Sequence, residues 1–427
     1  MSTRLLRWEI TSKCNLKCKH CIVENVRHTD CDIDTNKKII DKLKINGVNE
    51  ILFTSKEPFA YESFLELVRY CSINDIYVAI ITNGTLIDEE AITFLYRQKI
   101  KYIAISLDGW TAQSNDQIRG EGTFDKIIKT IERFSKENIS RDDAYIPLYI
   151  QNLVTTYNNH EIDEMFNLLD KYPDVQISIG QITESGNASN NKECIITQSD
   201  FRKTKQEIMN RNKEFRKRIF FKDESYFEGV WFNFINGRSF QTAPPKCSID
   251  KNYYTLLPNG DMCKCIMLKN VEEDVEYEAV FGNILNDVKS TNYNFDFDRS
   301  YKEKGSCKTC KVSDVCNLCY IISDSEVKLN EQRSSCDYYR DKIEKSVDSI
   351  LQGELKIKLN KSIITMDKGI YVVKDNYSVM AVEIDERLLA KIHEIMNSRT
   401  NSLCLRDSNW SQSEVEEMVY GNLIFKA

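Results

Sequence analysis

The sequence lacks a long basic run and an apolar run of membrane length, and its N-terminus lacks the apolar central segment of a signal peptide. Its formal net charge is −7 and its Lys and Arg residues are dispersed, which argues against a protein that binds nucleic acid through phosphate contacts. A bilayer-spanning helix needs a longer apolar stretch than any present here. We therefore expect a cytoplasmic protein with neither a nucleic-acid nor a membrane partner.

Cysteine, in contrast, is abundant, with 15 residues in the chain. Disulfides do not persist in a reducing compartment, so clustered cysteines there indicate metal or redox chemistry. Three cysteines lie from Cys14 to Cys21 and eight lie from Cys247 to Cys336. The other four are scattered, and we interpret them as buried or incidental thiols: Cys31, Cys71, Cys194 and Cys404.

The first half of the chain alternates β-rich apolar runs with amphipathic helical patterns, which predicts a parallel sheet with right-handed crossovers. Strands are predicted at residues 5–10, 50–54, 77–82, 102–106, 145–154 and 176–179. Helices are predicted at residues 36–44, 61–71, 88–97, 124–134 and 161–169. The repeat predicts an α/β fold, a partial (β/α)6 TIM-like barrel with its active residues at the carboxyl ends of the strands. A doubly wound open sheet is the alternative, because it has the same periodicity.

Changes of composition along the chain predict three domains. The polar stretch at residues 184–193 predicts a loop, a charged helix follows at 200–217, and the cysteine-rich region begins near Pro244 and Pro245. We expect the barrel at residues 1–220, a small cysteine-rich domain at 221–340 and a C-terminal α+β extension at 341–427.

The C-terminal extension has its own alternation of strand and helix patterns. A helix is expected to follow Cys336, and Ser411-x-x-Glu414 is a capping box that predicts the start of the last helix. Strands are predicted at residues 355–359, 362–365, 370–374 and 379–384, with a helix at 387–396.

Cys14, Cys18 and Cys21 directly follow the first predicted strand. Three thiolates from one loop can bind three irons of a [4Fe–4S] cluster and leave the fourth iron open to a small molecule. The alternative is a zinc site completed by His20 or His28, because structural zinc takes four protein ligands.

The segment CNLKCKHC, with Cys-x3-Cys-x2-Cys after the first strand, resembles the signature of the radical S-adenosylmethionine (SAM) superfamily. The resemblance implies that Cys14, Cys18 and Cys21 hold a [4Fe–4S] cluster whose open iron binds SAM. An electron from a flavodoxin- or ferredoxin-type donor would then cleave SAM to a 5′-deoxyadenosyl radical, which abstracts a hydrogen atom from the substrate. His20 occupies the position whose ring packs near the adenine.

Further residues resemble the SAM-binding segments of that family. Glu57 and Pro58 match the end of its Gly-Gly-Glu-Pro segment, which holds the SAM amino group, but Ser55 and Lys56 replace the two glycines. Glycine allows close backbone approach and unusual φ angles, so the replacement bears on the geometry of SAM binding. The resemblance also assigns to SAM binding Thr82, Asn83, Ser106, Asp108 and Arg119.

The second group of cysteines, together with Gly260, resembles the SPASM domain that follows the barrel in one subgroup of radical SAM enzymes, although Cys316 and Cys319 stand one residue closer than usual. The resemblance implies two auxiliary [4Fe–4S] clusters, the first with Cys263 as a spare thiol for its fourth ligand. Cys247, Cys265 and Cys319 would hold the first cluster, and Cys307, Cys310, Cys316 and Cys336 the second. On spacing alone, a pair of structural zinc sites is the alternative.

Enzymes of the SPASM subgroup mostly modify peptides. The resemblance therefore implies an oxidoreductase that forms a thioether or carbon–carbon cross-link in a ribosomally made precursor peptide. The C-terminal extension resembles small domains that bind leader peptides, which would add an extended peptide to a strand edge. Ile266 stands where sulfatase maturases carry a carboxylate, which argues against that branch. The alternatives are dehydrogenation or epimerisation of a small molecule or sugar, and a non-catalytic iron–sulfur or zinc protein that binds a partner.

Overall fold

The computed structural model describes residues 5–23, 28–141, 144–182, 184, 186–211, 218–221, 227, 230–231, 234–235, 254–263, 280–286, 310, 326–352, 354–359, 363–367, 370–374, 379–383, 386–396, 402–403, 405, 409–420 and 423–426. The chain divides into two compact units. Met1–Lys222 and Ser248–Phe295 form the first unit, and Asp223–Cys247 and Asp296–Ala427 form the second. The division into three domains at residues 220 and 340 stays a prediction.

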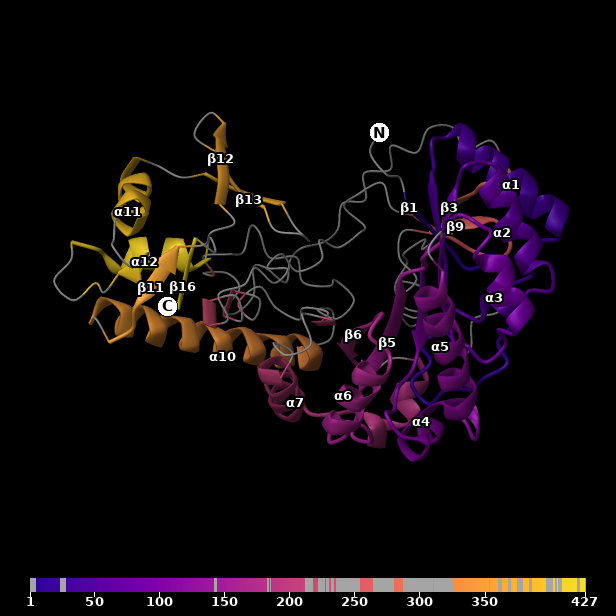
Figure 1. Cartoon of the computed structure of the whole chain (residues 1–427), viewed down its shortest axis with the longest axis horizontal. Coiled ribbons are helices and arrows are strands. Elements are labelled where there is room, and N and C mark those ends of the chain that lie inside the picture. The colour runs from indigo at the N-terminus through magenta and orange to yellow at the C-terminus, as the bar shows by residue number, and fades with distance from the viewer. Residues whose placement is uncertain are drawn as a thin grey trace. The chain divides into compact units, whose positions relative to one another are not determined.

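The first unit is built on a sheet whose six central strands are parallel and follow one another in chain order (Figure 1). They are β1 (Leu5–Trp8), β2 (Glu50–Phe53), β3 (Tyr77–Thr82), β4 (Ile100–Ser106), β5 (Leu148–Val154) and β6 (Val175–Gln181). A doubly wound sheet reverses its strand order at a switch point, and this order does not reverse. The predicted parallel core with a partial TIM-barrel arrangement is therefore confirmed, and the doubly wound alternative is excluded.

Helices connect the strands and cover one face of the sheet (Figure 1). They are α1 (Ile33–Ile45), α2 (Phe64–Ile73), α3 (Glu89–Leu95), α4 (Ala112–Arg119), α5 (Thr123–Ser140) and α6 (Ile162–Lys171), with a short 3-10 helix η1 at Pro58–Ala60. The sequence predicts all of these α-helices except α4. Because α4 is mostly polar, it lacks the wide apolar stripe by which an amphipathic helix is found.

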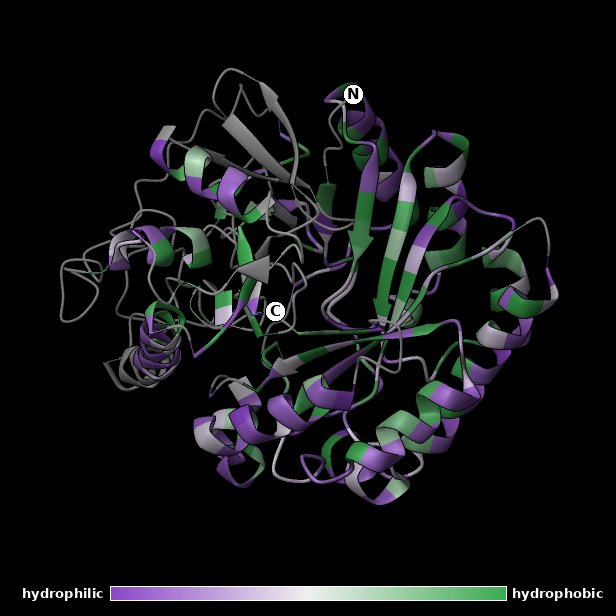
Figure 2. Cartoon of the chain, turned by 60° about the vertical axis from the view of Figure 1, so that its left-hand side comes forward, coloured by the Kyte–Doolittle hydropathy of each residue, from purple (hydrophilic) through white to green (hydrophobic). Residues whose placement is uncertain are grey.

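The core of the first unit lies between the sheet and these helices. Figure 2 shows strands that are largely hydrophobic and helices on which hydrophobic and hydrophilic residues alternate. Ile127, Ile131 and Phe134 are fully buried on one side of α5 because they recur at helical spacing. Trp8 and Phe53 stack their rings across β1 and β2, with the ring centroids 5.5 Å apart.

The sheet continues beyond the six central strands on both sides. On one side β7 (Ile219–Phe221) pairs in parallel with β6. On the other side β8 (Thr255–Leu256) pairs in parallel with β1, and β9 (Asp261–Cys263) and β10 (Val280–Asn283) follow in antiparallel order. Gly260, at φ +83°, closes the turn between β8 and β9, where a left-handed backbone favours glycine.

After β6 come two short 3-10 helices, η2 (Gly186–Asn190) and η3 (Lys192–Cys194), and then α7 (Gln198–Arg211). η2 and η3 lie in the stretch at residues 184–193 that the sequence predicts to be a polar loop, so the prediction is corrected to two short 3-10 turns. Residues 186–191 are three asparagines and three small residues, a composition typical of turns rather than of a regular helix. The predicted helix at residues 200–217 corresponds to α7, and residues 212–217 lie outside the described part of the chain.

The described part of the second unit includes a long helix, two small sheets and two shorter helices. α10 (Glu326–Leu351) precedes β11 (Ile357–Leu359), which pairs with β15 (Ser402–Leu403) and β16 (Ile424–Lys426). β12 (Ile363–Asp367), β13 (Ile370–Lys374) and β14 (Val379–Glu383) form an antiparallel sheet in that order. α11 (Glu386–Met396) and α12 (Gln412–Tyr420) are also described, so the predicted helices at residues 387–396 and after Ser411 and the four predicted strands are confirmed. The helix expected to follow Cys336 begins earlier, at Glu326, and the sequence does not predict β15 and β16.

The capping box is also confirmed. The backbone N–H of Ser411 donates to Glu414 Oε2 at 2.7 Å, and the Glu414 N–H donates back to Ser411 Oγ at 3.3 Å. None of the helices in the described ranges is long and apolar enough to cross a membrane.

Candidate cofactor site

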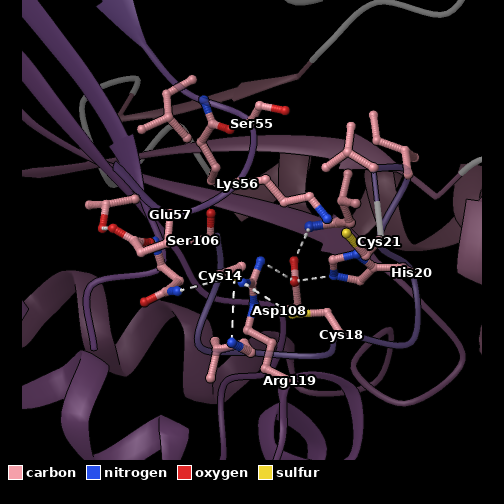
Figure 3. Close-up of a pocket in the computed structure, with 18 of the residues that line it drawn as sticks. Cys14, Cys18, His20, Cys21, Ser55, Lys56, Glu57, Ser106, Asp108 and Arg119 are labelled. Atoms are coloured by element: carbon pink, nitrogen blue, oxygen red, sulfur yellow. Dashed lines mark hydrogen bonds and ion pairs between the residues drawn. The ribbon is translucent and has the colours of Figure 1, made fainter. Parts of the chain in front are cut away.

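The residues that the sequence assigns to the cluster and to SAM meet in one pocket at the carboxyl ends of the parallel strands (Figure 3). The cysteine loop follows β1, Glu57 follows β2, and Ser106 ends β4. Strand ends are where this architecture places active sites. Ten predicted residues line the pocket: Cys14, Cys18, His20, Cys21, Glu57, Thr82, Asn83, Ser106, Asp108 and Arg119.

The three cysteines of the loop form no disulfide and line the same pocket. Burial raises the pKa of Cys14 and raises the pKa of Cys18 to about 12, although the Arg119 guanidinium opposes the shift at Cys18. Cys14 and Cys18 each interact electrostatically with Cys21, and all three residues line the pocket. Thiols with raised pKa values are protonated at neutral pH, and a metal that binds them must displace their protons.

This donor set fits a [4Fe–4S] cluster, because each of three thiolates from one loop can bind a separate iron. The zinc alternative needs His20 or His28 as a fourth ligand, but His20 Nε2 lies 2.5 Å from Asp108 Oδ2. Among the residues that the structure describes, no three His, Cys, Asp or Glu side chains, these cysteines included, are grouped around the position of a single metal ion. A cluster differs from such a site because each thiolate binds its own iron.

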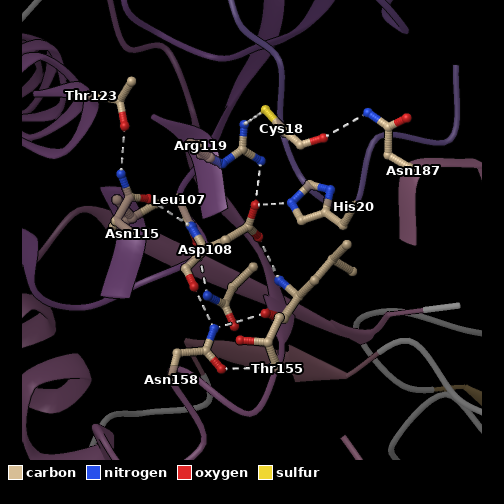
Figure 4. A network of polar contacts seen from close by, with 12 residues as sticks. Cys18, His20, Leu107, Asp108, Asn115, Arg119, Thr123, Thr155, Asn158 and Asn187 are labelled. Atoms are coloured by element: carbon tan, nitrogen blue, oxygen red, sulfur yellow. Dashed lines mark hydrogen bonds and ion pairs between the residues drawn. The ribbon is translucent and has the colours of Figure 1, made fainter. Parts of the chain in front are cut away.

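Asp108 is the centre of a buried polar network beside the cysteines (Figure 4). Its Oδ2 atom lies 2.6 Å from Arg119 Nη2 and also contacts His20, while its Oδ1 accepts the backbone N–H of Leu153 at 2.9 Å. The Asp108 backbone is held as well, since its N–H donates to Asn115 Oδ1 and its carbonyl accepts from Asn158 Nδ2. The carboxylate is thus fixed from several directions.

The charged neighbours of Asp108 determine the protonation state of its carboxyl group. Burial alone would raise the pKa of Asp108, but Arg119 and His20 hold it well below its usual range. Arg119 is also buried, and its Nη1 atom lies 4.0 Å from Cys18 Sγ. Asp108 and Arg119 therefore form an ionised pair whose guanidinium contacts a cysteine thiol.

Glu57 is buried and its carboxylate is occupied by contacts within the chain. Oε1 accepts from Thr82 Oγ1 at 2.8 Å and from the Phe59 N–H at 3.1 Å, and Oε2 accepts from the Asn83 N–H at 2.7 Å. Burial raises the pKa of Glu57, and these hydrogen bonds oppose the shift. Through these hydrogen bonds Glu57 links the end of β2 to the end of β3. The sequence does not predict this structural role.

Asn83 links this part of the pocket to the cysteine loop. Its Nδ2 atom donates to Asn15 Oδ1 at 2.9 Å and lies 4.0 Å from Cys14 Sγ. Ser106, the last residue of β4, also lines the pocket.

Ser55 and Lys56, which replace the two glycines of the family motif, both line the pocket. Ser55 has φ +91°, in the left-handed region that favours glycine. Its Oγ atom is buried and has no hydrogen-bond partner among the residues that the structure describes. The segment therefore keeps a glycine-like backbone although it carries a side chain.

Residues 186–194 hold the cysteine loop from outside, and we call this segment the strap. The Asn187 N–H donates to the Cys21 carbonyl at 2.9 Å, and its side chain donates to the Cys18 carbonyl at 3.1 Å. Asn191 Nδ2 donates to the Lys19 carbonyl at 3.3 Å. The sequence shows only a polar stretch here, and its asparagines are the one signal that backbone-capping side chains are present.

Gly186 allows the strap to approach the loop. A Cβ atom at this position would lie 2.4 Å from the Cys21 carbonyl oxygen and 2.7 Å from Ile22 Cα, and the residue has φ +57°. Both facts require glycine here.

The remaining cysteines are only partly described. Cys263 is buried in β9, whereas Cys310 and Cys336 are partly buried. The predicted auxiliary-cluster ligands Cys247, Cys265, Cys307, Cys316 and Cys319 lie outside the described residues. Of the four scattered thiols, Cys71 and Cys194 are buried as expected, Cys31 is partly buried, and Cys404 lies outside the described residues.

Comparison with known proteins identifies relatives of this chain. The family model of the radical SAM superfamily matches residues 8–180. Mycofactocin maturase MftC of Mycolicibacterium smegmatis is 34% identical over 169 residues, which are 39% of this chain and 42% of that protein. The chain thus matches less than half the length of that relative. An AdoMet-dependent heme synthase of Nitratidesulfovibrio vulgaris is 25% identical over 329 residues, which are 74% of this chain and 87% of that protein.

Solved structures with the same fold include Streptococcus suis SuiB bound to S-adenosylmethionine. The TM-score is 0.60 at 19% identity, and the match covers 76% of this chain and 75% of SuiB. A structure of anSMEcpe with bound AdoMet has a TM-score of 0.55 at 18% identity and covers 80% of this chain and 95% of that one.

Proposed function

Because residues 8–180 form a radical SAM domain, we propose that this chain cleaves SAM reductively at a [4Fe–4S] cluster held by Cys14, Cys18 and Cys21. Such a cluster, when bound with SAM, supplies a 5′-deoxyadenosyl radical for hydrogen abstraction. The observation that carries the proposal is the convergence of residues from four strand ends on one pocket beside the three thiols. This convergence supports a catalytic site over a non-catalytic partner-binding protein.

The chain's own residues position the cofactors under this proposal. Arg119, oriented by Asp108, would hold Cys18 in place and present a cation to the SAM carboxylate. His20 would lie against the adenine with its ring fixed by Asp108. Glu57 already accepts three hydrogen bonds, so it would take the SAM ammonium at its remaining lone-pair position.

Thr82, Asn83 and Ser106 would complete the polar wall of the pocket. The Thr82 hydroxyl donates to Glu57 and the Asn83 side chain donates to Asn15 Oδ1, so these polar atoms are already oriented before a ligand enters. Preoriented groups of this kind bind a polar ligand at a lower entropic cost than flexible ones.

We propose a ribosomally made precursor peptide as the substrate, with an oxidative thioether or carbon–carbon cross-link as the product. The highest identity among the relatives named above is to a maturase, MftC. The described part of the sheet β12–β13–β14 pairs β12 and β14 with β13 alone. An extended peptide can add to such an edge through main-chain hydrogen bonds, so this sheet would bind the leader segment.

Haem synthesis is the second candidate. It is favoured by the length of the match to the AdoMet-dependent heme synthase, which extends well beyond the radical SAM domain.

The peptide candidate also includes a SPASM domain with two auxiliary clusters. Their proposed ligands are Cys247, Cys263, Cys265 and Cys319 for one cluster and Cys307, Cys310, Cys316 and Cys336 for the other.

The first experiment is reconstitution of the full chain with iron and sulfide without oxygen, followed by SAM and a strong reductant. We expect 5′-deoxyadenosine from the native protein and none from a Cys14/Cys18/Cys21→Ala variant. An iron-loaded native protein that forms no 5′-deoxyadenosine would contradict the proposal.

The substrate class is tested with the same preparation. Candidate precursor peptides encoded beside this chain are incubated with the loaded protein, and mass spectrometry follows the loss of hydrogen that a cross-link causes. Conversion of an iron porphyrin, without change in any peptide, would favour the haem synthase candidate.

A further inference from the structure

The polar lining of the pocket continues from Ser106 into the next two strands of the sheet. Ser106 is in register with Gln151 on β5, and Gln151 is in register with Ser178 on β6. Neighbouring strands of a sheet lie about 4.8 Å apart, so these three residues form a short row across it. Gln151, like Ser106, lines the pocket that the three cysteines share.

The side chains of this row lie on the face of the sheet that is turned away from the helices. The residue that precedes each of them belongs to the core between the sheet and the helices: Ile105, Ile150 and Ile177. Side chains alternate between the two faces along a strand, so the row points to the opposite face, which is the inside of the partial barrel.

Packing does not explain the row. The interior of a barrel is usually filled by layers of bulky branched side chains, whereas these three are polar. Each is partly buried, and among the described residues none of the three side chains has a hydrogen-bond partner. A polar group that a ligand shields from water must gain a partner, because otherwise its desolvation costs free energy. The row therefore suits a ligand that forms hydrogen bonds with it.

The chemistry of the row distinguishes between the two candidate substrates. The carboxamide of Gln151 both donates and accepts hydrogen bonds, and so does the hydroxyl of Ser178. A peptide main-chain amide has the complementary N–H and C=O groups. The carboxylates of an iron porphyrin are acceptors only and pair best with Arg or Lys, but the row carries no charge.

We propose that Gln151 and Ser178 bind a main-chain amide of the peptide substrate and hold that substrate beside the cofactors in the pocket. The inference rests on the proposed function, because it requires a peptide as the substrate. Gln151 is then a substrate-binding residue that selects a peptide over an iron porphyrin, while Ser106 stays on the cofactor side of the row.

The test measures dissociation constants of the reconstituted full chain by equilibrium dialysis. The probes are SAM, a precursor peptide encoded beside this chain and iron coproporphyrin III. Gln151→Leu removes both hydrogen-bonding groups, and Gln151→Glu keeps the size of the side chain but loses the donor, so it serves also if Gln151→Leu fails to fold. We expect either substitution to weaken peptide binding about tenfold. The affinities for SAM and for the porphyrin, and the iron content, should not change.

Gln176→Leu is the matched control. Gln176 lies on the same face of β6, two residues before Ser178, and does not line the pocket. We expect this variant to bind the peptide as tightly as the native protein does.

Four outcomes would overturn the inference. Both Gln151 variants could bind the peptide as tightly as the native protein, both could lose affinity for SAM to the same extent as for the peptide, Gln176→Leu could weaken peptide binding equally, or the porphyrin alone could depend on Gln151. The proposed function fails separately, when the native protein forms no 5′-deoxyadenosine, and the proposed substrate fails when it forms 5′-deoxyadenosine but changes no peptide.

Discussion

Asp108 and Arg119 pair at 2.6 Å although both side chains are buried, at 1% and 8% exposure. The pair joins the end of β4 to the end of α4 and brings the guanidinium against Cys18. A buried pair of this kind is costly to break, because the remaining charge stays in a medium of low polarity.

Replacing Asp108 by Asn should therefore destabilise the first unit by about 3–5 kcal/mol, because Arg119 is left buried without its counter-charge. Denaturant unfolding of the cluster-free protein measures the change. Asp75→Asn is the matched control, since Asp75 pairs with Lys99 at the surface, and we expect little change there. Equal destabilisation by the two substitutions would show that burial of the Asp108 pair has no special weight.

Gly186→Ala should loosen the strap from the cysteine loop, because the new Cβ would meet the Cys21 carbonyl oxygen at 2.4 Å. We expect a lower iron content after anaerobic reconstitution. Gly122→Ala imposes a similar backbone strain, at φ +72°, with no atom within 4 Å of the new Cβ. If both variants lose iron to the same extent, then the strain alone, and not contact with the loop, decides the outcome.

Ser55→Gly should raise the free energy of unfolding by about 1 kcal/mol, because it relieves the left-handed backbone and removes a buried hydroxyl without a partner. Ser55→Ala removes the hydroxyl and keeps the Cβ atom, so it separates the two effects. The measurement is the denaturation midpoint of each variant. A Ser55→Gly protein no more stable than Ser55→Ala would mean that the backbone of Ser55 carries no strain.

Ser411→Ala should cost the second unit about 1 kcal/mol, because it removes one half of the capping box of α12. Hydrogen exchange of the α12 amides should become faster. Ser413→Ala serves as control, since its hydroxyl lies on the exposed surface of the helix and bonds only to the Glu417 side chain among the described residues. Unchanged exchange in Ser411→Ala would contradict a capping role.

The sequence predicts the parallel strands and the position of the pocket well, because strand periodicity and the spacing of Cys14, Cys18 and Cys21 are local patterns. It does not predict that Asp108 pairs with Arg119. Both residues resemble SAM-binding positions when they are read singly, and their pairing depends on where α4 ends. The same holds for Glu57, whose partners lie at the end of the next strand.

The strap and Ser55 show two further limits. Asn187 and Asn191 bind backbone carbonyls of a loop far away in sequence, and such contacts leave no periodic signal. At Ser55 the sequence reveals the loss of glycine but not the backbone that results. That backbone is accompanied by long-range hydrogen bonds such as that from the Thr54 N–H to the Trp8 carbonyl, which have no local sequence signal.

The pairing of β8 with β1 has a consequence for the order in which the protein can form on the ribosome. β1 is synthesised long before one of its two neighbours, which lies at Thr255–Leu256. Until that segment is synthesised, the backbone groups on this side of β1 have no strand to pair with, and an open edge of this kind is prone to join other chains. The nascent chain must therefore keep its first strand protected while most of the first unit and the intervening part of the second are translated.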